Sequence, residues 1–211
     1  MENAIESTTP FLTIDPMISE RLNPVFQALD SGDWKEVVEN DDDLRIRLVT
    51  QGAEVPDERS SIKWDDANLF FLSCIELTKI GQPFPLEAGI SKERFGRFPF
   101  GDGSPVTYLR NWIREPRRNP EEFPHLTQML ENLDTRLVDT SMGKGTGKLE
   151  MRGWLTNQET RELRKLLASK SWTPSAEEPL DGGCQDCAKH LLALLRAAEK
   201  RKCGVLLRVH N

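Results

Sequence analysis

Hydrophobic positions recur every three or four residues through much of the chain, which is typical of helices that bury one face. This spacing predicts short helices over residues 16–22, 24–30 and 34–39, and a longer amphipathic helix over residues 126–138. The most apolar segment differs, because in its middle nearly every residue is apolar and no polar face remains. We therefore expect a helix over residues 64–80 in the centre of the core.

Alternation of apolar and polar residues, which is typical of a strand with one buried face, occurs in two places and predicts strands over residues 44–48 and 149–152. After Gly204, which ends the last helix, we expect residues 205–210 to form a closing strand. Between the last two strands, the spacing of leucines predicts one helix that starts after Thr156 and a final helix over residues 185–202.

Pairs of a short polar residue and a proline predict three helix starts. The polar side chain can accept a hydrogen bond from a free N–H group, and proline suits the first helical position. These pairs are Asp15-Pro16, Asn23-Pro24 and Ser104-Pro105. Thr156 and Glu159 have the spacing of a capping box, in which each residue's side chain bonds to the other's backbone N–H.

Together these elements predict an α+β fold, a mainly helical single domain over residues 1–211 with a small sheet of about three strands. Residues 82–124 are rich in proline, phenylalanine and arginine. We expect this segment to wrap over the core around one helix at 105–114. Residues 147–211 form a candidate α/β sub-unit within the domain.

Composition narrows the class of protein. The chain of 211 residues carries 28 Lys and Arg against 34 Asp and Glu, a net charge of −6, which disfavours binding to nucleic acid. Its longest apolar run is too short to span a membrane, and its acidic N-terminus lacks the basic start of a signal peptide. We therefore expect a soluble cytoplasmic protein with no membrane partner, whose four cysteines are free thiols.

Cys184, Cys187 and His190 form the one cluster whose spacing suggests metal ligands. Thiolates at the start of a helix have a lowered pKa and could hold zinc together with the imidazole. Cys203 could not complete the site, because it would lie about 24 Å from Cys187 along a continuous helix. Cys187 also falls in register with the apolar stripe of that helix. We therefore expect these residues to pack in the core and start the helix, with no metal or other cofactor bound.

Two further motifs resemble binding loops in composition alone. The glycine-rich residues 142–148 place Met142 where a phosphate-binding loop needs glycine, and Leu149 follows where that loop needs serine or threonine. We expect a connection between a helix and a strand. The run Asp41-Asp42-Asp43 lacks the later ligands and the glycine of a calcium loop, and we expect a solvated turn.

The charge pattern has one anomaly, at residues 92–118, where seven basic residues stand against three acidic ones among aromatic residues. Interleaved cations and aromatic rings can bind a nucleic-acid strand. We favour a simpler interpretation, in which the rings cover the core and the arginines pair with the acidic first 63 residues. The candidates in this segment for binding an anion or a partner are Arg94, Arg97, Arg110 and Arg114.

No nucleophile, catalytic-histidine or cofactor motif stands in the sequence. The leading hypothesis is therefore a non-enzymatic module that presents its acidic first third to a basic protein partner, for example as an inhibitor or immunity-type protein. The alternative is an enzyme with a dispersed active site in residues 92–118. A flat apolar patch rimmed by carboxylates would favour the binding module, whereas a concave pocket lined by Arg94, Arg97 or Arg114 with a nearby titratable pair would favour the enzyme.

Overall fold

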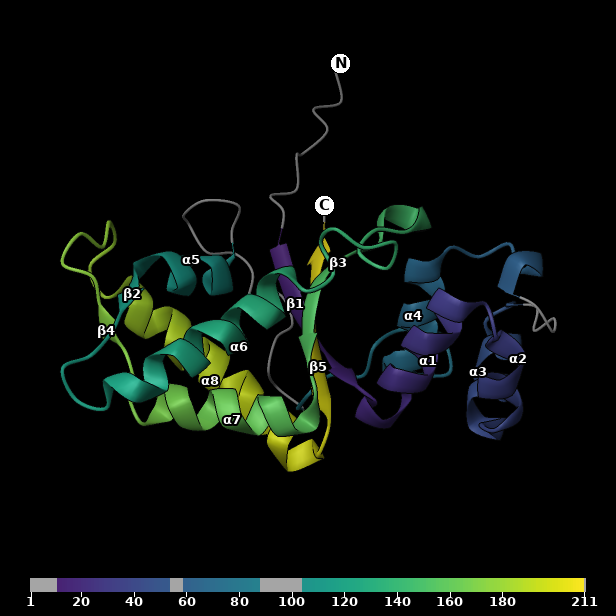
Figure 1. Cartoon of the computed structure of the whole chain (residues 1–211), viewed down its shortest axis with the longest axis horizontal. Helices are drawn as coiled ribbons and strands as arrows, with labels where there is room; N and C mark the ends of the chain where they lie inside the picture. The colour runs from purple at the N-terminus through teal and green to yellow at the C-terminus, as the bar shows by residue number, and fades with distance from the viewer. Residues whose placement is uncertain (1–10, 54–58, 88–103, 211) are drawn as a thin grey trace, which may run out of the picture.

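Helices make up most of the molecule, and short strands join them. The structure, a computed structural model, describes residues 11–53, 59–87 and 104–210. Within these residues the chain has the predicted α+β architecture, mainly helical with a small three-stranded sheet (Figure 1). The helices are α1 (Ser19–Ser31), α2 (Trp34–Glu39), α3 (Asp42–Thr50), α4 (Asp66–Cys74), α5 (Pro105–Trp112), α6 (Phe123–Thr135), α7 (Asn157–Ala168) and α8 (Gly183–Arg201). The strands are β1 (Phe11–Met17), β2 (Ile113–Arg114), β3 (Glu150–Leu155), β4 (Thr173–Pro174) and β5 (Gly204–His210).

The three-stranded sheet has the order β1-β5-β3, and both pairings are antiparallel. Strand β5 is therefore the central strand, although it comes last in the chain. It pairs along its whole length with β1, from Gly204 opposite Met17 to His210 opposite Phe11. The strand predicted at 205–210 is confirmed as part of β5, and the one predicted at 149–152 is confirmed from Glu150 onward, as the start of β3.

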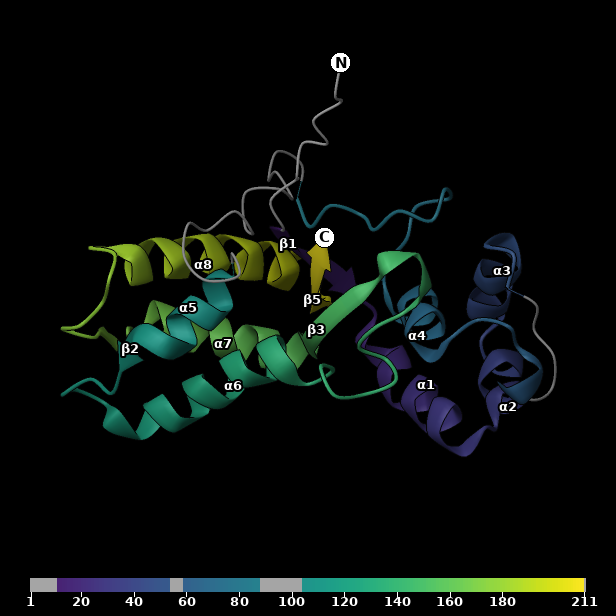
Figure 2. The same cartoon turned by 90° about the horizontal axis from the view of Figure 1, so that it is seen from above.

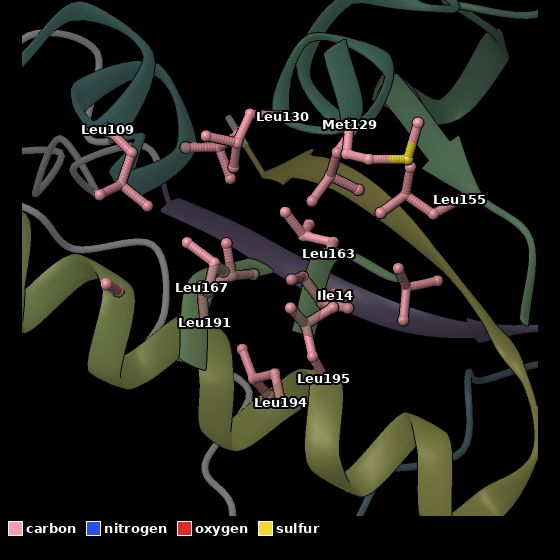
Figure 3. Close-up of a cluster of buried hydrophobic side chains, with 14 of the residues drawn as sticks. Ile14, Leu109, Met129, Leu130, Leu155, Leu163, Leu167, Leu191, Leu194 and Leu195 are labelled. Atoms are coloured by element: carbon pink, nitrogen blue, oxygen red, sulfur yellow. The ribbon is translucent and has the colours of Figure 1, made fainter. Parts of the chain in front are cut away.

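Each face of the sheet is covered by a different group of helices. Helices α1–α4 lie on one side and α5–α8 on the other, and Figures 1 and 2 show the sheet between them. Successive side chains at the start of β5 point to opposite faces of the sheet. Leu206 packs in the core formed with α1–α4, which we call the N-terminal core. Val205 and Leu207 pack in the core formed with α5–α8, which we call the C-terminal core. Figure 3 shows Ile14 of β1 in the C-terminal core with Leu163, Leu167, Leu191 and Leu195.

A β-bulge in the edge strand β3 changes which of its side chains face each core. The register with β5 shifts between Met151 and Gly153. The extra residue lets Met151 and Trp154, three positions apart, both face the N-terminal core. Gly153 lies against α6, where an added Cβ would come within 2.1 Å of the Asn132 carbonyl oxygen. Helix α6 therefore covers this edge of the sheet closely, and the Leu137 N–H donates to the Arg152 carbonyl.

The predicted strand at residues 44–48 is wrong, because these residues belong to helix α3. Asp41 caps this helix by accepting a hydrogen bond from the Leu44 N–H, so the aspartate run starts a helix and is not a solvated turn. Leu44 and Leu48, one turn apart, are fully buried, whereas Ile46 is 62% exposed. Apolar residues at 44, 46 and 48 are compatible with the two-residue period of a strand and also with a short helix. The cap at Asp41 favours the helix.

Two of the three predicted proline starts are also wrong. Asp15 and Pro16 lie inside β1, and Pro24 lies inside α1. Strand β1 tolerates the proline because it is an edge strand of the three-stranded sheet. Residues 16 and 17 therefore end strand β1, and the rest of the two predicted helices forms the single helix α1 from Ser19.

The helix predicted at 64–80 is confirmed only in its middle, as α4. After Cys74 the chain becomes extended and lies along the edge of β1 that does not pair with β5. There the Ile18 N–H donates to the Cys74 carbonyl, and the Glu76 N–H donates to the Pro16 carbonyl. Ile75 is fully buried there, opposite Met17. Helix α4 is central to the N-terminal core alone, and the centre of the whole molecule is β5.

Two predicted helix caps are confirmed. Ser104 accepts a hydrogen bond from the Thr107 N–H and Pro105 takes the first turn of α5. Thr156 and Glu159 make both bonds of the capping box. Burial alone would raise the pKa of Glu159, but the hydrogen bonds from Arg136 and from the Thr156 N–H hold this pKa below its ordinary value. In the segment 82–124, residues 88–103 lie outside the described residues.

We predict that Ile75→Ala lowers the free energy of unfolding by about 2–5 kcal/mol, because it removes a fully buried side chain between β1 and α4. Ile46→Ala, the matched control on the exposed face of α3, should change this free energy by no more than about 0.5 kcal/mol. Urea denaturation measures both. Equal effects of the two substitutions would contradict the assignment of Ile75 to the core.

Candidate functional site

The two cysteines and the histidine proposed from spacing are not brought together. Cys184 and Cys187 are buried in the C-terminal core at the start of α8, whereas His190 is exposed. Burial raises the pKa of both thiols, that of Cys184 to about 12. Among the residues that the structure describes, no group of three His, Cys, Asp or Glu side chains is placed to hold a metal ion. Both thiols are therefore packed in the core, and burial favours their protonated form.

A carboxylate that the sequence analysis missed organises the start of α8. Glu178 accepts hydrogen bonds from the Cys184 N–H and from the Tyr108 hydroxyl. The Leu180 N–H donates to the same hydroxyl at 3.3 Å. Burial raises the pKa of Tyr108 to about 12, and the neighbouring Glu178 carboxylate adds to the shift. These contacts connect α5 to the N-terminus of α8.

Arg110 forms an ion pair with a buried carboxylate of the fold. Its Nη1 lies 2.6 Å from Oδ2 of Asp134, a residue with no exposed surface. Arg152 of β3 forms an ion pair with the same carboxylate at 3.0 Å, and its Nε donates to the Asp134 backbone carbonyl. The Thr107 hydroxyl of α5 donates to the carboxylate. Two cations and a hydroxyl satisfy this buried charge, as a buried ion needs. The partners of Arg110 therefore lie on α6 and not in the acidic first 63 residues.

The other basic candidates do not form a site with Arg110. Arg114 is exposed at the end of β2, and its guanidinium donates to the carbonyl oxygens of Asn111 and Ile113. Arg94 and Arg97 lie outside the described residues. Neither Arg110 nor Arg114 lines the hollows described below. Arg110 and Arg114 are therefore held by groups of the fold, on α6 and at the end of α5.

The glycine-rich loop serves packing against α4. Asp65 caps α4 through the Asn68 N–H and also accepts from the Thr146 N–H of the loop at 2.8 Å. Burial would raise the pKa of Asp65, but these N–H bonds hold it below its ordinary value. A Cβ at Gly145 would come within 2.7 Å of the Asp65 carboxylate. Glycine there permits a close contact between the loop and the cap.

A large hollow lies between α1, α2 and α3, and has a volume of about 810 Å³. We call it the acidic hollow. Its floor is apolar and includes buried Val25 and Leu44. Its rim carries the exposed carboxylates of Glu20, Asp33 and Glu36. None of these three carboxylates makes an ion pair or a hydrogen bond with the residues that the structure describes.

One cation lines the acidic hollow, and it is neutralised. Arg21 donates to both oxygens of Asp41, with distances of 2.6 and 2.9 Å, and lies 3.6 Å from Asp43. Burial would raise the pKa of Asp41, but its bond with Arg21 lowers it below its ordinary value. The pair ties α1 to the start of α3 and leaves the rim carboxylates as the uncompensated charge. The excess of acidic residues in the first third signals this site in the sequence, whereas its hollow shape has no sequence signal.

A comparison of the chain with protein-family models, with curated proteins and with solved structures finds no match. The site therefore has to be interpreted from its own geometry. In the described part of the chain, no helix is long and apolar enough to cross a membrane.

We predict that none of the four cysteines reacts quickly with a thiol-specific disulfide reagent at about pH 8 while the protein is folded, because all four are buried and burial raises their pKa values. All four should react at once in denaturant. Absorbance of the released chromophore counts the thiols. Fast reaction of Cys184 or Cys187 in the native protein, detected by mass spectrometry, would contradict their placement in the core.

Proposed function

We propose that this protein binds a basic segment of another protein in the acidic hollow, without catalysing a reaction. The observation that carries the proposal is an apolar floor rimmed by three carboxylates that have no partner among the described residues. Lysine and arginine side chains match such a surface, because their aliphatic stems cover apolar area while their charged ends reach the rim. An inhibitor or immunity-type protein that covers a basic surface is one form of this function.

The charges around the hollow favour a cationic partner over a nucleic acid. Residues 19–50, which form α1–α3, carry eight acidic and four basic side chains. Such a surface repels a polyanion and attracts a polycation, so it raises the rate at which a basic partner associates. The four cysteines are free thiols, which fits a reducing compartment, and we place the protein in the cytoplasm on that ground.

The alternative, an enzyme built on residues 92–118, receives no support from the arginines that the structure describes. Arg110 neutralises buried Asp134, and Arg114 binds backbone carbonyls. A catalytic role would need these cations to face a substrate in a hollow. The acidic hollow lies on other helices and contains none of them.

We predict that a labelled peptide with lysines around a central leucine binds the wild-type protein saturably and binds the Glu20→Lys/Glu36→Lys variant roughly tenfold or more weakly. Each reversal replaces an attraction with a repulsion of about 0.5–1 kcal/mol. Fluorescence anisotropy measures the affinity, and raising the salt concentration should weaken binding.

The matched control is Glu177→Lys, which reverses an exposed carboxylate outside the hollow and should leave the affinity within about twofold. All three proteins should show the same helical circular dichroism. Equal affinities for wild type and the double variant, or no saturable binding by wild type, would refute the proposed function.

A further inference from the structure

A second hollow of opposite charge lies far from the acidic one. It has a volume of about 500 Å³ and runs between the end of α7, strand β4 and the outer face of α8. We call it the basic trough. Figures 1 and 2 place β4 and α7–α8 on one side of the sheet, whereas α1–α3 lie on the other side, toward the opposite end of the long axis. A ligand in the trough would therefore not contact the acidic hollow.

The described walls of the basic trough carry three cations and no acidic side chain. Lys170, Lys189 and Arg196 line it, and none of them makes an ion pair with the residues that the structure describes. Other basic residues of α8 behave differently, since Lys200 pairs with Glu87 and Arg201 pairs with Glu76. The positive charge of the trough is thus left uncompensated within the described structure.

The floor of the trough is apolar. It contains Trp172, Leu192 and Ala188, which pack against or within the C-terminal core. The Trp172 indole N–H already donates to the Leu167 carbonyl at 3.3 Å, so the ring needs no polar partner from a ligand. Trp172 and Leu192 are only partly buried, and they leave apolar surface between the cations.

The spacing along α8 defines the shape of a matching ligand. Lys189, Leu192 and Arg196 follow each other at intervals of three and four residues, which places them on one helix face. The Cα atoms of Lys189 and Arg196 are then about 10 Å apart along the axis, with Leu192 between them. A ligand with two anionic groups separated by an apolar one matches this order of cation, apolar side chain and cation.

We propose that the basic trough binds an acidic amphipathic segment of a protein partner. An apolar side chain of that segment contacts Trp172 and Leu192, and two carboxylates reach Lys189 and Arg196. Such a segment is a helix with acidic residues about two turns apart, which is a recurring form of peptide recognition in grooves. The trough is inferred from its own residues and does not depend on the proposed function of the acidic hollow.

The probe for this proposal is a labelled helical peptide with two glutamates two helical turns apart and leucines between them. We expect saturable binding to the wild-type protein by fluorescence anisotropy, weakened by salt. Lys189→Glu/Arg196→Glu should lower the affinity at least tenfold, and Lys189→Gln/Arg196→Gln should lower it less. Both residues are exposed on α8, so these variants should keep the wild-type circular dichroism and melting temperature.

Two control variants test whether the peptide binds in the trough and nowhere else. Arg161→Glu reverses an exposed cation of α7 that does not line the trough and should leave the affinity within twofold. Glu20→Lys/Glu36→Lys should also leave it unchanged, which distinguishes this result from the test of the acidic hollow. No saturable binding by wild type, or equal affinity in Lys189→Glu/Arg196→Glu, would overturn the proposal. Tighter binding of inorganic phosphate or of single-stranded DNA to the same residues would overturn it in favour of an anion or nucleic-acid site.

Discussion

The burial of both faces of β5 is the constraint on which the rest of the structure depends. Leu206 packs against α1–α4, while its neighbours Val205 and Leu207 pack against α5–α8, and all three are fully buried. A three-stranded sheet with two apolar faces cannot be stable in water unless each face is covered. The two groups of helices are therefore held in place by the same strand. Each group carries one of the two hollows of opposite charge, since α1–α3 line the acidic hollow and α7 and α8 line the basic trough.

Much of the C-terminal part of the fold could be predicted from the sequence, because local signals and tertiary packing agree there. The capping box at Thr156 and the helical spacing of leucines mark α7 and α8, and the apolar run after Gly204 marks β5. In the N-terminal part the signals conflict. Pro16 suggests a helix start, but pairing with β5 makes β1 a strand. Residues 44–48 alternate as a strand would, but the Asp41 cap and the burial of Leu44 and Leu48 on one helix face determine α3.

The candidate sites are formed by residues from several helices and strands, so residue spacing along the sequence does not predict them. The excess of acidic residues in the first third could be predicted to attract a basic partner, but the hollow between α1, α2 and α3 could not. The arginine-rich segment drew attention by composition, and the structure shows that Arg110 neutralises Asp134, a residue 24 positions away. The basic trough has no signal in the sequence, because Lys170, Lys189 and Arg196 are scattered along the chain. Their distinguishing property is the lack of a partner among the described residues, which becomes visible only in three dimensions.

We expect β5 to couple the two helical groups into one cooperative unit. Native-state hydrogen exchange on Leu206→Ala and Leu207→Ala tests it directly, because each substitution truncates a side chain that packs in one core only. We expect each variant to lower the protection of the slowest amides in α4 and in α7 by the same free energy, since the two groups of helices unfold together. If Leu206→Ala lowers protection in α4 and leaves α7 unchanged, the two cores unfold independently and the claim is wrong.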